Sequence, residues 1–269
     1  MLKDITFGQY FESNSVIHRI DPRVKIVLMI VAIVFIFVSQ NWFSLLFSTA
    51  FVLFIIIVSK VPLKMYLKNM KAILPVLIFT AIINLFYGDN GTVLLSFWKF
   101  TITTEGLYKS FFMALRIALL IFISSVLTYT TTPNDLTDAI ESLLSPLKFV
   151  GLKSAVHTLA MMMTIALRFI PTLIEEAEKI MNAQKARGAD LESGSLIDRV
   201  KALIPILIPL LVSSVRRAYE LAEAMECRCY NGGEGKTRMK QMKTSLIDVY
   251  AIIALVVMCA VIITFNIIF

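Results

Sequence analysis

The sequence has 269 residues, of which 58% are hydrophobic, and its mean hydropathy is +0.79. These values exclude an ordinary soluble domain and fit an integral membrane protein that lies in a lipid bilayer. The net charge of +7 does not indicate a nucleic-acid partner, because membrane proteins collect Lys and Arg in their cytoplasmic loops.

Long stretches without charged residues predict five transmembrane helices. Four lie in an N-terminal membrane region, residues 1–131, and the last lies in residues 246–269. Their predicted ranges are about 24–39, 42–59, 72–87, 107–130 and 246–268. The first two helices are joined by a turn at Ser39-Gln40-Asn41. Each is slightly short of the roughly 20 residues that cross the hydrocarbon core.

Basic residues predict the orientation of these helices. Residues 60–71, KVPLKMYLKNMK, hold four lysines and no acid, and residues 236–243, KTRMKQMK, hold four basic residues and no acid. Positive residues concentrate on the cytoplasmic side of membrane proteins. We therefore expect a multi-pass protein with a cytoplasmic N-terminus and an external C-terminus.

Residues 132–245 carry more than half of the charged residues, although they lie between two spans. We expect them to form a cytoplasmic or interfacial insert of helices. The first helix has the start signals of Thr132 as N-cap, Pro133 at the first helical position and Asp135 at the positive end of the dipole. The fold class is therefore an all-α membrane protein with about five spans and this insert.

Two longer helices follow in the insert, at about 153–187 and 195–229. An apolar stripe from Met163 to Met181 and another from Leu207 to Met225 predict that the two helices pack against each other. The charged side chains of the first helix, Glu176 among them, are expected on its other faces. The apolar run in the second helix is too short to span a membrane and is expected to lie against it.

Each long helix ends on an arginine between small residues. The two triplets are Ala186-Arg187-Gly188 and Cys227-Arg228-Cys229. Either arginine alone has a structural interpretation as a match for the helix dipole, with Gly188 or Asn231-Gly232-Gly233 terminating the helix. Two matched ends on one side of the membrane also fit a binding role, because a guanidinium can contact a partner carboxylate at two points.

Here the sequence resembles a known family over nearly its whole length, the transmembrane scaffold (T component) of energy-coupling factor (ECF) transporters. These are ATP-driven importers of vitamins and trace metals in prokaryotes. The similar segments are SVIHRIDPRVK, LRFIPTLIEEAEKI with AQKARGAD, and AMECRCY. Cys227 departs from the family pattern, in which alanine is expected, but it is also small.

The resemblance implies that both arginine triplets dock into two ABC-type ATPase subunits at the ends of coupling helices. It also implies a separate membrane subunit that binds the substrate, and a scaffold in the prokaryotic cell membrane that binds no nucleotide. ATP-driven closure of the ATPases would move the coupling helices and reorient the substrate-binding subunit. The chain itself is then neither an enzyme nor a cofactor-binding protein.

Two further arginines are candidate contacts. Arg116 lies inside the fourth predicted span, where a charge is costly and usually faces protein or water. A functional contact and a buried structural pair both fit it. Arg168 fits an interfacial anchor or a contact with a partner. Asp21-Pro22 is expected to start the first membrane helix, with Lys25 at the cytosolic interface.

Other motifs carry little chemistry. The stretch NGGEGKT at residues 231–237 is similar to a phosphate-binding loop, but Tyr230 stands where that motif needs glycine. His18 and His157 stand alone, with no HExxH motif and no carboxylate–histidine pair, so metal chemistry has little support. The three cysteines have no disulfide or zinc spacing.

Two alternatives to the scaffold remain, an integral membrane enzyme and a stand-alone secondary transporter. An enzyme needs convergent catalytic groups, which are not visible at readable spacing. A secondary transporter needs broken helices and ionisable residues near the midplane of the membrane, for which Arg116 and Asn84 are the candidates. The sequence does not identify the imported substrate.

Overall fold

The computed structural model of the chain describes residues 10–86, 92–97, 100–145, 153–189, 196–231 and 244–268. The chain divides into two compact units. The membrane unit contains the described residues within 8–136 and 241–269, and the long-helix unit contains those within 137–240. The boundary falls inside the helix that opens the predicted insert.

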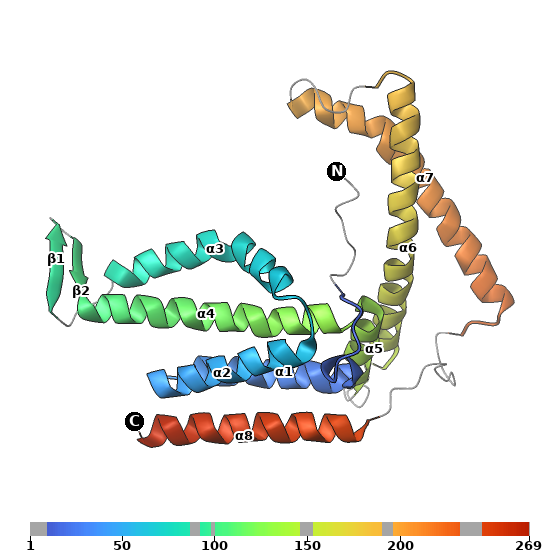
Figure 1. Cartoon of the computed structure of the whole chain (residues 1–269). Coiled ribbons are helices and arrows are strands. Elements are labelled where there is room, and N and C mark those ends of the chain that lie inside the picture. The colour runs from blue at the N-terminus through green and yellow to red at the C-terminus, as the bar shows by residue number, and fades with distance from the viewer. Residues whose placement is uncertain are drawn as a thin grey trace. The chain divides into compact units, whose positions relative to one another are not determined.

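Helices dominate both units (Figure 1). The membrane unit holds the 3-10 helix η2 (Ile17–Arg19) and the α-helices α1 (Pro22–Val38), α2 (Trp42–Ser59), α3 (Leu63–Phe86), α4 (Thr104–Thr130) and α8 (Leu246–Ile268). α5 (Pro133–Leu143) crosses the boundary, and α6 (Lys153–Ala186) and α7 (Leu196–Cys227) form the long-helix unit. The prediction of an all-α membrane protein is confirmed. One short antiparallel hairpin, β1 (Val93–Phe97) with β2 (Phe100–Thr103), was not expected.

Six helices of the described chain are long and apolar enough to cross a membrane, namely α2, α3, α4, α6, α7 and α8. α1 matches the first predicted span but has only 17 residues. α3 begins nine residues before the predicted 72, because its first turns contain lysines that suit a helix but not the hydrocarbon core. Length and composition alone also admit α6 and α7 as spans. Their placement on the cytoplasmic side stays a prediction.

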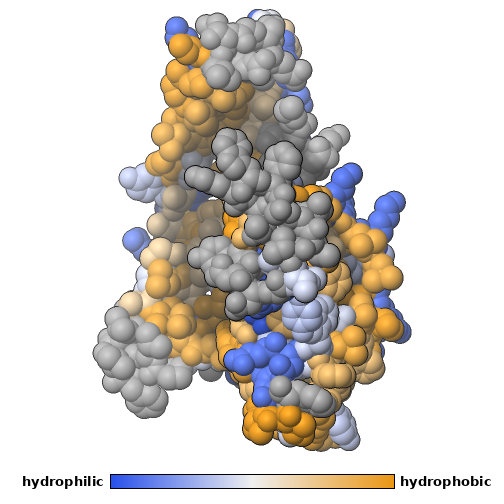
Figure 2. Space-filling model, turned by 90° about the vertical axis from the view of Figure 1, so that its left-hand side faces the viewer, coloured by the Kyte–Doolittle hydropathy of each residue, from blue (hydrophilic) through white to orange (hydrophobic). Residues whose placement is uncertain are grey.

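The membrane unit has its small hydroxyl side chains inside and large apolar side chains outside. Along α2, Ser44 and Ser48 are fully buried, and the Ser48 hydroxyl donates to the Ser44 carbonyl at 2.8 Å. On the same helix Leu46 and Ile57 are exposed. Lipid tails solvate apolar side chains, so helix contacts in a membrane use small residues whose hydroxyls bond locally. Hydrophobic residues accordingly cover wide areas of the surface in Figure 2.

The Asp248 carboxylate accepts hydrogen bonds at the starts of two membrane helices, α1 and α8. Asp21 is the N-cap of α1, and its Oδ1 accepts a hydrogen bond from the Arg23 N–H at 2.9 Å, as the sequence predicted. Asp248, in the first turn of α8, accepts hydrogen bonds from the Asp21 N–H at 2.8 Å and from the Ser245 N–H at 2.6 Å. Asp248 therefore satisfies backbone donors of both α1 and α8.

Lys25 caps the end of α4 from within the membrane unit. Its Nζ donates to the Thr130 carbonyl at 2.9 Å and to the His18 carbonyl at 3.4 Å. The residue is only 7% exposed, which the sequence did not predict, and its position at the cytosolic interface stays a prediction. Its ammonium turns inward because the last carbonyls of α4 have no partners within their own helix.

The long helices α6 and α7 pack together, as predicted, and cross each other (Figure 1). At a polar contact between them, Glu176 accepts hydrogen bonds from the Ser213 hydroxyl and the Arg217 guanidinium. The expectation that Glu176 faces away is wrong, because it pairs with a cation on α7. Met163 and Leu207, which begin the two apolar stripes, are exposed, so the stripes are only partly used.

Candidate partner-binding helix ends

The end of α6 is a Schellman motif built around Arg187. Gly188 has the left-handed conformation, with a φ of 87°. Its N–H donates to the Lys185 carbonyl at 3.0 Å, and the Ala189 N–H donates to the Gln184 carbonyl at 3.0 Å. These bonds satisfy carbonyls of the last helical turn and turn the chain away from the axis. Arg187 is thereby the capping residue of the helix.

α7 ends in the same motif, built around Arg228. The Cys229 N–H donates to the Glu226 carbonyl at 2.8 Å, and the Tyr230 N–H donates to the Met225 carbonyl at 3.0 Å. Each of these bonds corresponds, position for position, to a bond at the end of α6. The two arginines therefore occupy equivalent capping positions.

The terminator of α7 differs from the one that the sequence predicted. Asn231-Gly232-Gly233 was expected to end the helix, but the chain already turns at Cys229, whose φ is 54°. That conformation costs a residue with a Cβ about 1–2 kcal/mol, which is why sequence reasoning favoured glycine. Cys227 and Cys229 are exposed free thiols, and the NGGEGKT stretch lies outside the described residues from Gly232 onward.

All six residues of the two triplets are exposed. Neither guanidinium makes a hydrogen bond or an ion pair with a described residue. An arginine with only a structural role could reach back to the last carbonyls of its helix, but backbone N–H groups already occupy carbonyls in both final turns. The five N–H donors of each arginine are therefore available to a partner.

The two arginine ends lie apart within the long-helix unit. In Figure 1, α6 ends near the top of the picture and α7 ends at the lower right, beyond the point where the two helices cross. A single small ligand would not bridge both ends. The arrangement suits two separate partner surfaces, or two copies of one surface.

Arg116 lies in α4, and its guanidinium donates to the Ser39 carbonyl in the turn between α1 and α2. The guanidinium carbon lies 4.9 Å from the centre of the Phe112 ring, a cation–π contact. Nε is buried, without a hydrogen-bond partner among the described residues. Of the two interpretations of this arginine, these contacts favour the structural one. In it, Arg116 stabilises the turn between α1 and α2 through the Ser39 carbonyl.

Arg168 is exposed on α6 and has no bonding partner among the described residues, so it remains open to an interface or a partner. His157 was expected to stand alone, but its Nδ1 lies 3.4 Å from Glu141 Oε1. His18 is satisfied locally, with Nδ1 2.6 Å from the Ser15 hydroxyl and Nε2 2.9 Å from the Phe11 carbonyl.

Sequence reasoning missed two polar contacts that organise the units. Ser245 and Asp248 match the spacing of a capping box, S-x-x-D, so the start of α8 was readable in the sequence. The pairing of Glu176 with Arg217 left no such signal, since 41 residues separate the partners. A contact of that range depends on how two helices cross.

These features define a multi-pass α-helical membrane protein that presents two matched arginine ends. The model of the cobalt transport protein family (CbiQ) matches residues 13–240. The energy-coupling factor transporter transmembrane protein EcfT of Ruminiclostridium cellulolyticum is 51% identical over 249 residues, covering 93% of this chain and 92% of its own length. The EcfT protein of Clostridium kluyveri is 51% identical over 96% of both chains, and that of Lactococcus lactis is 39% identical over 98% of this chain and 99% of its own.

The chain therefore belongs to this family, the transmembrane (T) component of ECF transporters. The resemblance inferred from the sequence is confirmed.

Proposed function

We propose that this chain is the scaffold and coupling subunit of an ATP-driven importer of a vitamin or trace metal. In this proposal it links two cytoplasmic ATPase subunits to a separate membrane subunit that captures the substrate. The observation that supports it most is the equivalent capping geometry of Arg187 and Arg228, each exposed and unpaired with any described residue. The chain would contribute no catalytic group and bind no nucleotide.

Each guanidinium would meet a carboxylate on an ATPase subunit. Its planar fork can make two parallel hydrogen bonds, which an ammonium cannot. The small neighbours of the two arginines, Ala186 with Gly188 and Cys227 with Cys229, would let the partner surface approach the helix end closely. The capping bonds hold each arginine at a fixed place, so little chain entropy would be lost on docking.

Motion would pass through the long-helix unit. If ATP-driven closure moves the two ATPase subunits, it moves the ends of α6 and α7 with them. The two helices contact each other at Glu176, so displacement of one would bear on the other. That shift would then reorient the substrate-binding subunit in the bilayer.

We further propose that the N-terminus is cytoplasmic and the C-terminus external. The four lysines of residues 60–71 are exposed around the start of α3, where the positive-inside rule favours the cytoplasm. Single cysteines at Asn14, Thr92 and Asn231, in a background without native cysteines, test this with an impermeant thiol reagent on intact cells. Only Thr92→Cys should react, and reaction at Asn231→Cys would overturn the placement of the arginine ends.

The central test is the double variant Arg187→Ala, Arg228→Ala, assayed for co-purification of ATPase subunits and for substrate uptake. Loss of one partner of a buried, hydrogen-bonded charge pair costs about 2–5 kcal/mol, so assembly should fall by at least tenfold and uptake should nearly vanish. Arg→Lys should restore only part of the assembly. Arg216→Ala, at an exposed arginine in the middle of α7, is the matched control and should assemble normally.

Membrane levels of each variant are measured in parallel, so that loss of the protein is not taken for loss of docking. Normal assembly and normal uptake in the double variant would contradict the proposal. If the arginines only match the helix dipoles, lysine should replace them freely and alanine should cost under about 1 kcal/mol.

A further inference from the structure

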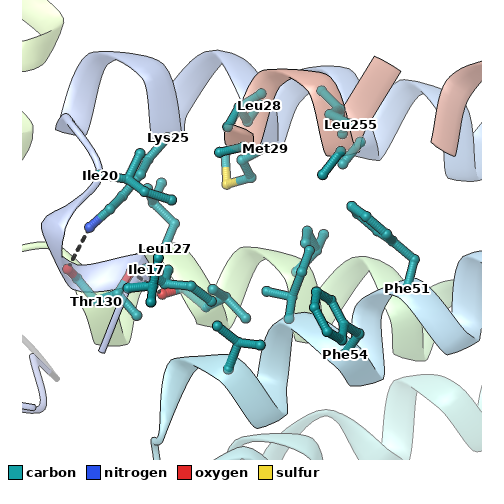
Figure 3. Close-up of a pocket in the computed structure, with 18 of the residues that line it drawn as sticks. Ile17, Ile20, Lys25, Leu28, Met29, Phe51, Phe54, Leu127, Thr130 and Leu255 are labelled. Carbon is teal, nitrogen blue, oxygen red and sulfur yellow. Dashed lines mark hydrogen bonds between the residues drawn. The ribbon is translucent and has the colours of Figure 1, made fainter. Parts of the chain in front are cut away.

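The membrane unit contains an apolar cavity of about 330 Å³ between four of its helices. α1 contributes Leu28 and Met29, α2 contributes Phe51 and Phe54, and α4 and α8 close the remaining sides (Figure 3). The volume falls in the range of pockets that hold small organic molecules. All residues that line the cavity belong to the membrane unit, and none of them belongs to the two arginine triplets on which the function proposed above rests.

The lining of this cavity does not suit water. Of the residues around it, only Lys25, Thr130 and Tyr250 carry polar groups. Figure 3 shows Lys25 turned toward Thr130, where its Nζ donates to the backbone carbonyl. A buried water needs two to four polar partners, and this lining does not offer them. The cavity opens to the surface of the membrane unit, and its apolar lining favours a hydrophobic occupant over water.

The mouth of the cavity can be placed from the lining residues that remain exposed. Val16 is 54% exposed, Phe54 is 60% exposed and Tyr250 is 70% exposed. Val16 immediately precedes η2, and Tyr250 lies in the first turns of α8, so the mouth lies near a helix end. Tyrosine at such a position is typical of a membrane interface, where its ring is apolar and its hydroxyl is hydrated.

The chain segment 16–20, which contributes three of the lining residues, also contains an exposed arginine. Arg19 is the last residue of η2. Ile17, the first residue of η2, and Ile20, which follows Arg19, both line the cavity. Arg19 is exposed, and its side chain makes no hydrogen bond or ion pair with a described residue. An apolar interior with Tyr250 at its mouth, and with an exposed arginine in the chain segment that lines it, matches the polarity of an anionic phospholipid, and basic sites between membrane helices recognise such headgroups.

We propose that this cavity is a binding site for one phospholipid, with an acyl chain between α1 and α2 and the phosphate at the mouth near Arg19 and Tyr250. The bilayer supplies this occupant directly. The bound chain fills the space between the four helices and so supports their packing. The site prefers an anionic headgroup to a zwitterionic one.

The test is native mass spectrometry of the purified full chain, incubated with equal amounts of dioleoyl phosphatidylglycerol and dioleoyl phosphatidylcholine. The wild-type chain should retain one phospholipid, mainly phosphatidylglycerol. Ala251→Phe fills the cavity from α8 and should lower retention about tenfold. Ala260→Phe, at an exposed position of α8 outside the cavity, is the matched control and should retain lipid as the wild type does.

Two more variants test the acyl-chain site and the headgroup preference separately. Ala254→Leu adds a smaller side chain to the lining and should lower retention by less, which decides the matter if Ala251→Phe does not fold. Arg19→Gln should keep the lipid but bring the two headgroups to nearly equal occupancy. Unchanged retention in both cavity-filling variants, or no lipid on the wild type, would overturn the proposal. Loss of the lipid on assembly with other subunits would assign the cavity to a partner helix and overturn it as well.

Discussion

The membrane unit and the long-helix unit use the same secondary structure but bury very different parts of it. The membrane unit has a continuous core that includes Ile36, Leu45 and Ile262, each with no exposed surface. In the long-helix unit, α6 and α7 bury only three apolar side chains below a tenth exposed among their described residues, Val156, Ala160 and Ile206. The first unit therefore has a buried core of its own, whereas the second buries few of its apolar side chains.

This difference indicates where each unit finds its stability. In the membrane unit, Asp248 and Lys25 satisfy the ends of helices with side chains from other helices. In the long-helix unit, each helix closes its own end with backbone bonds and leaves its terminal arginine free. Exposed apolar surface of that extent marks a surface that contacts another protein or lipid. We therefore expect the long-helix unit to gain order on assembly, while the membrane unit changes little.

The largest effect is expected at Asp248. Asp248→Ala would leave the buried N–H group of Asp21 without an acceptor, at about 1–3 kcal/mol, and the half-buried N–H group of Ser245 without one at a lower cost. The thermal unfolding midpoint of the purified chain should fall by several degrees. Asp248→Asn keeps one acceptor and should lose about half as much. Glu223→Ala, at an exposed site on α7, is the control and should leave the midpoint unchanged. Equal midpoints for Asp248→Ala and wild type would show that the contact between the starts of α1 and α8 does not stabilise the chain.

A smaller effect is expected at the crossing of α6 and α7. The Arg217 and Glu176 side chains are 32% and 21% exposed, so their ion pair is only partly screened and contributes about 1 kcal/mol. Glu176→Ala should raise backbone hydrogen exchange along both helices in the isolated chain. The swap Glu176→Arg with Arg217→Glu should restore part of the protection. Glu223→Ala, at an exposed site near the end of α7 and outside the polar pocket at the crossing, is the control. Exchange that does not change on loss of Glu176 would mean that apolar contacts alone hold the crossing.

The sequence predicted the parts of each unit that depend on local signals. The starts of α1 at Asp21-Pro22 and of α5 at Thr132 follow from capping residues, and α2 and α8 follow from runs without charge. It did not predict that Lys25 is buried, because a lysine near the end of a span ordinarily reaches toward water. Only the proximity of Thr130, 105 residues away, provides the acceptor that turns it inward.

In the long helices, too, the sequence did not predict features that depend on backbone conformation or on helix packing. The sequence located both arginine triplets but assigned the wrong terminator to α7, since the left-handed conformation of Cys229 has no signature in its residue type. It also missed the pairing of His157 with Glu141, because the two residues meet only through the packing of α5 and α6. Local capping rules reach a few residues, whereas these pairings depend on how helices pack.

A pH effect is expected in the membrane unit at His18. Burial, and then the charge of Lys25, lower the pKa of this imidazole in the folded chain. The neutral form is therefore favoured on folding. This contribution to stability is fully present above the unfolded pKa of about 6.5 and is lost as the pH falls through the lower folded pKa. The unfolding midpoint of the wild type should drop relative to that of His18→Gln as the pH falls below about 6.5. Parallel pH profiles for the two proteins would exclude His18 as the source.

Substitutions at the two helix ends are expected to change stability in opposite directions at equivalent positions, and the smallest of all the effects is at Cys229. Cys229→Gly relieves the strain of a left-handed residue with a Cβ, and the extra chain entropy of glycine offsets part of the gain, leaving about 0.5 kcal/mol. Gly188→Ala introduces that strain at a φ of 87° and should cost about 1 kcal/mol, although no neighbouring atom lies within 4 Å of the added methyl group. Hydrogen exchange in the last turn should slow in the first variant and quicken in the second.

Co-purification of ATPase subunits with Cys229→Gly tests whether the end of α7 needs only its backbone conformation or also the Cys229 thiol. If the capping motif matters only because it presents Arg228, Cys229→Gly should assemble as well as the wild type. If assembly weakens while the helix end becomes more ordered, the Cys229 thiol itself contacts the partner, and the two ends bind by different chemistry.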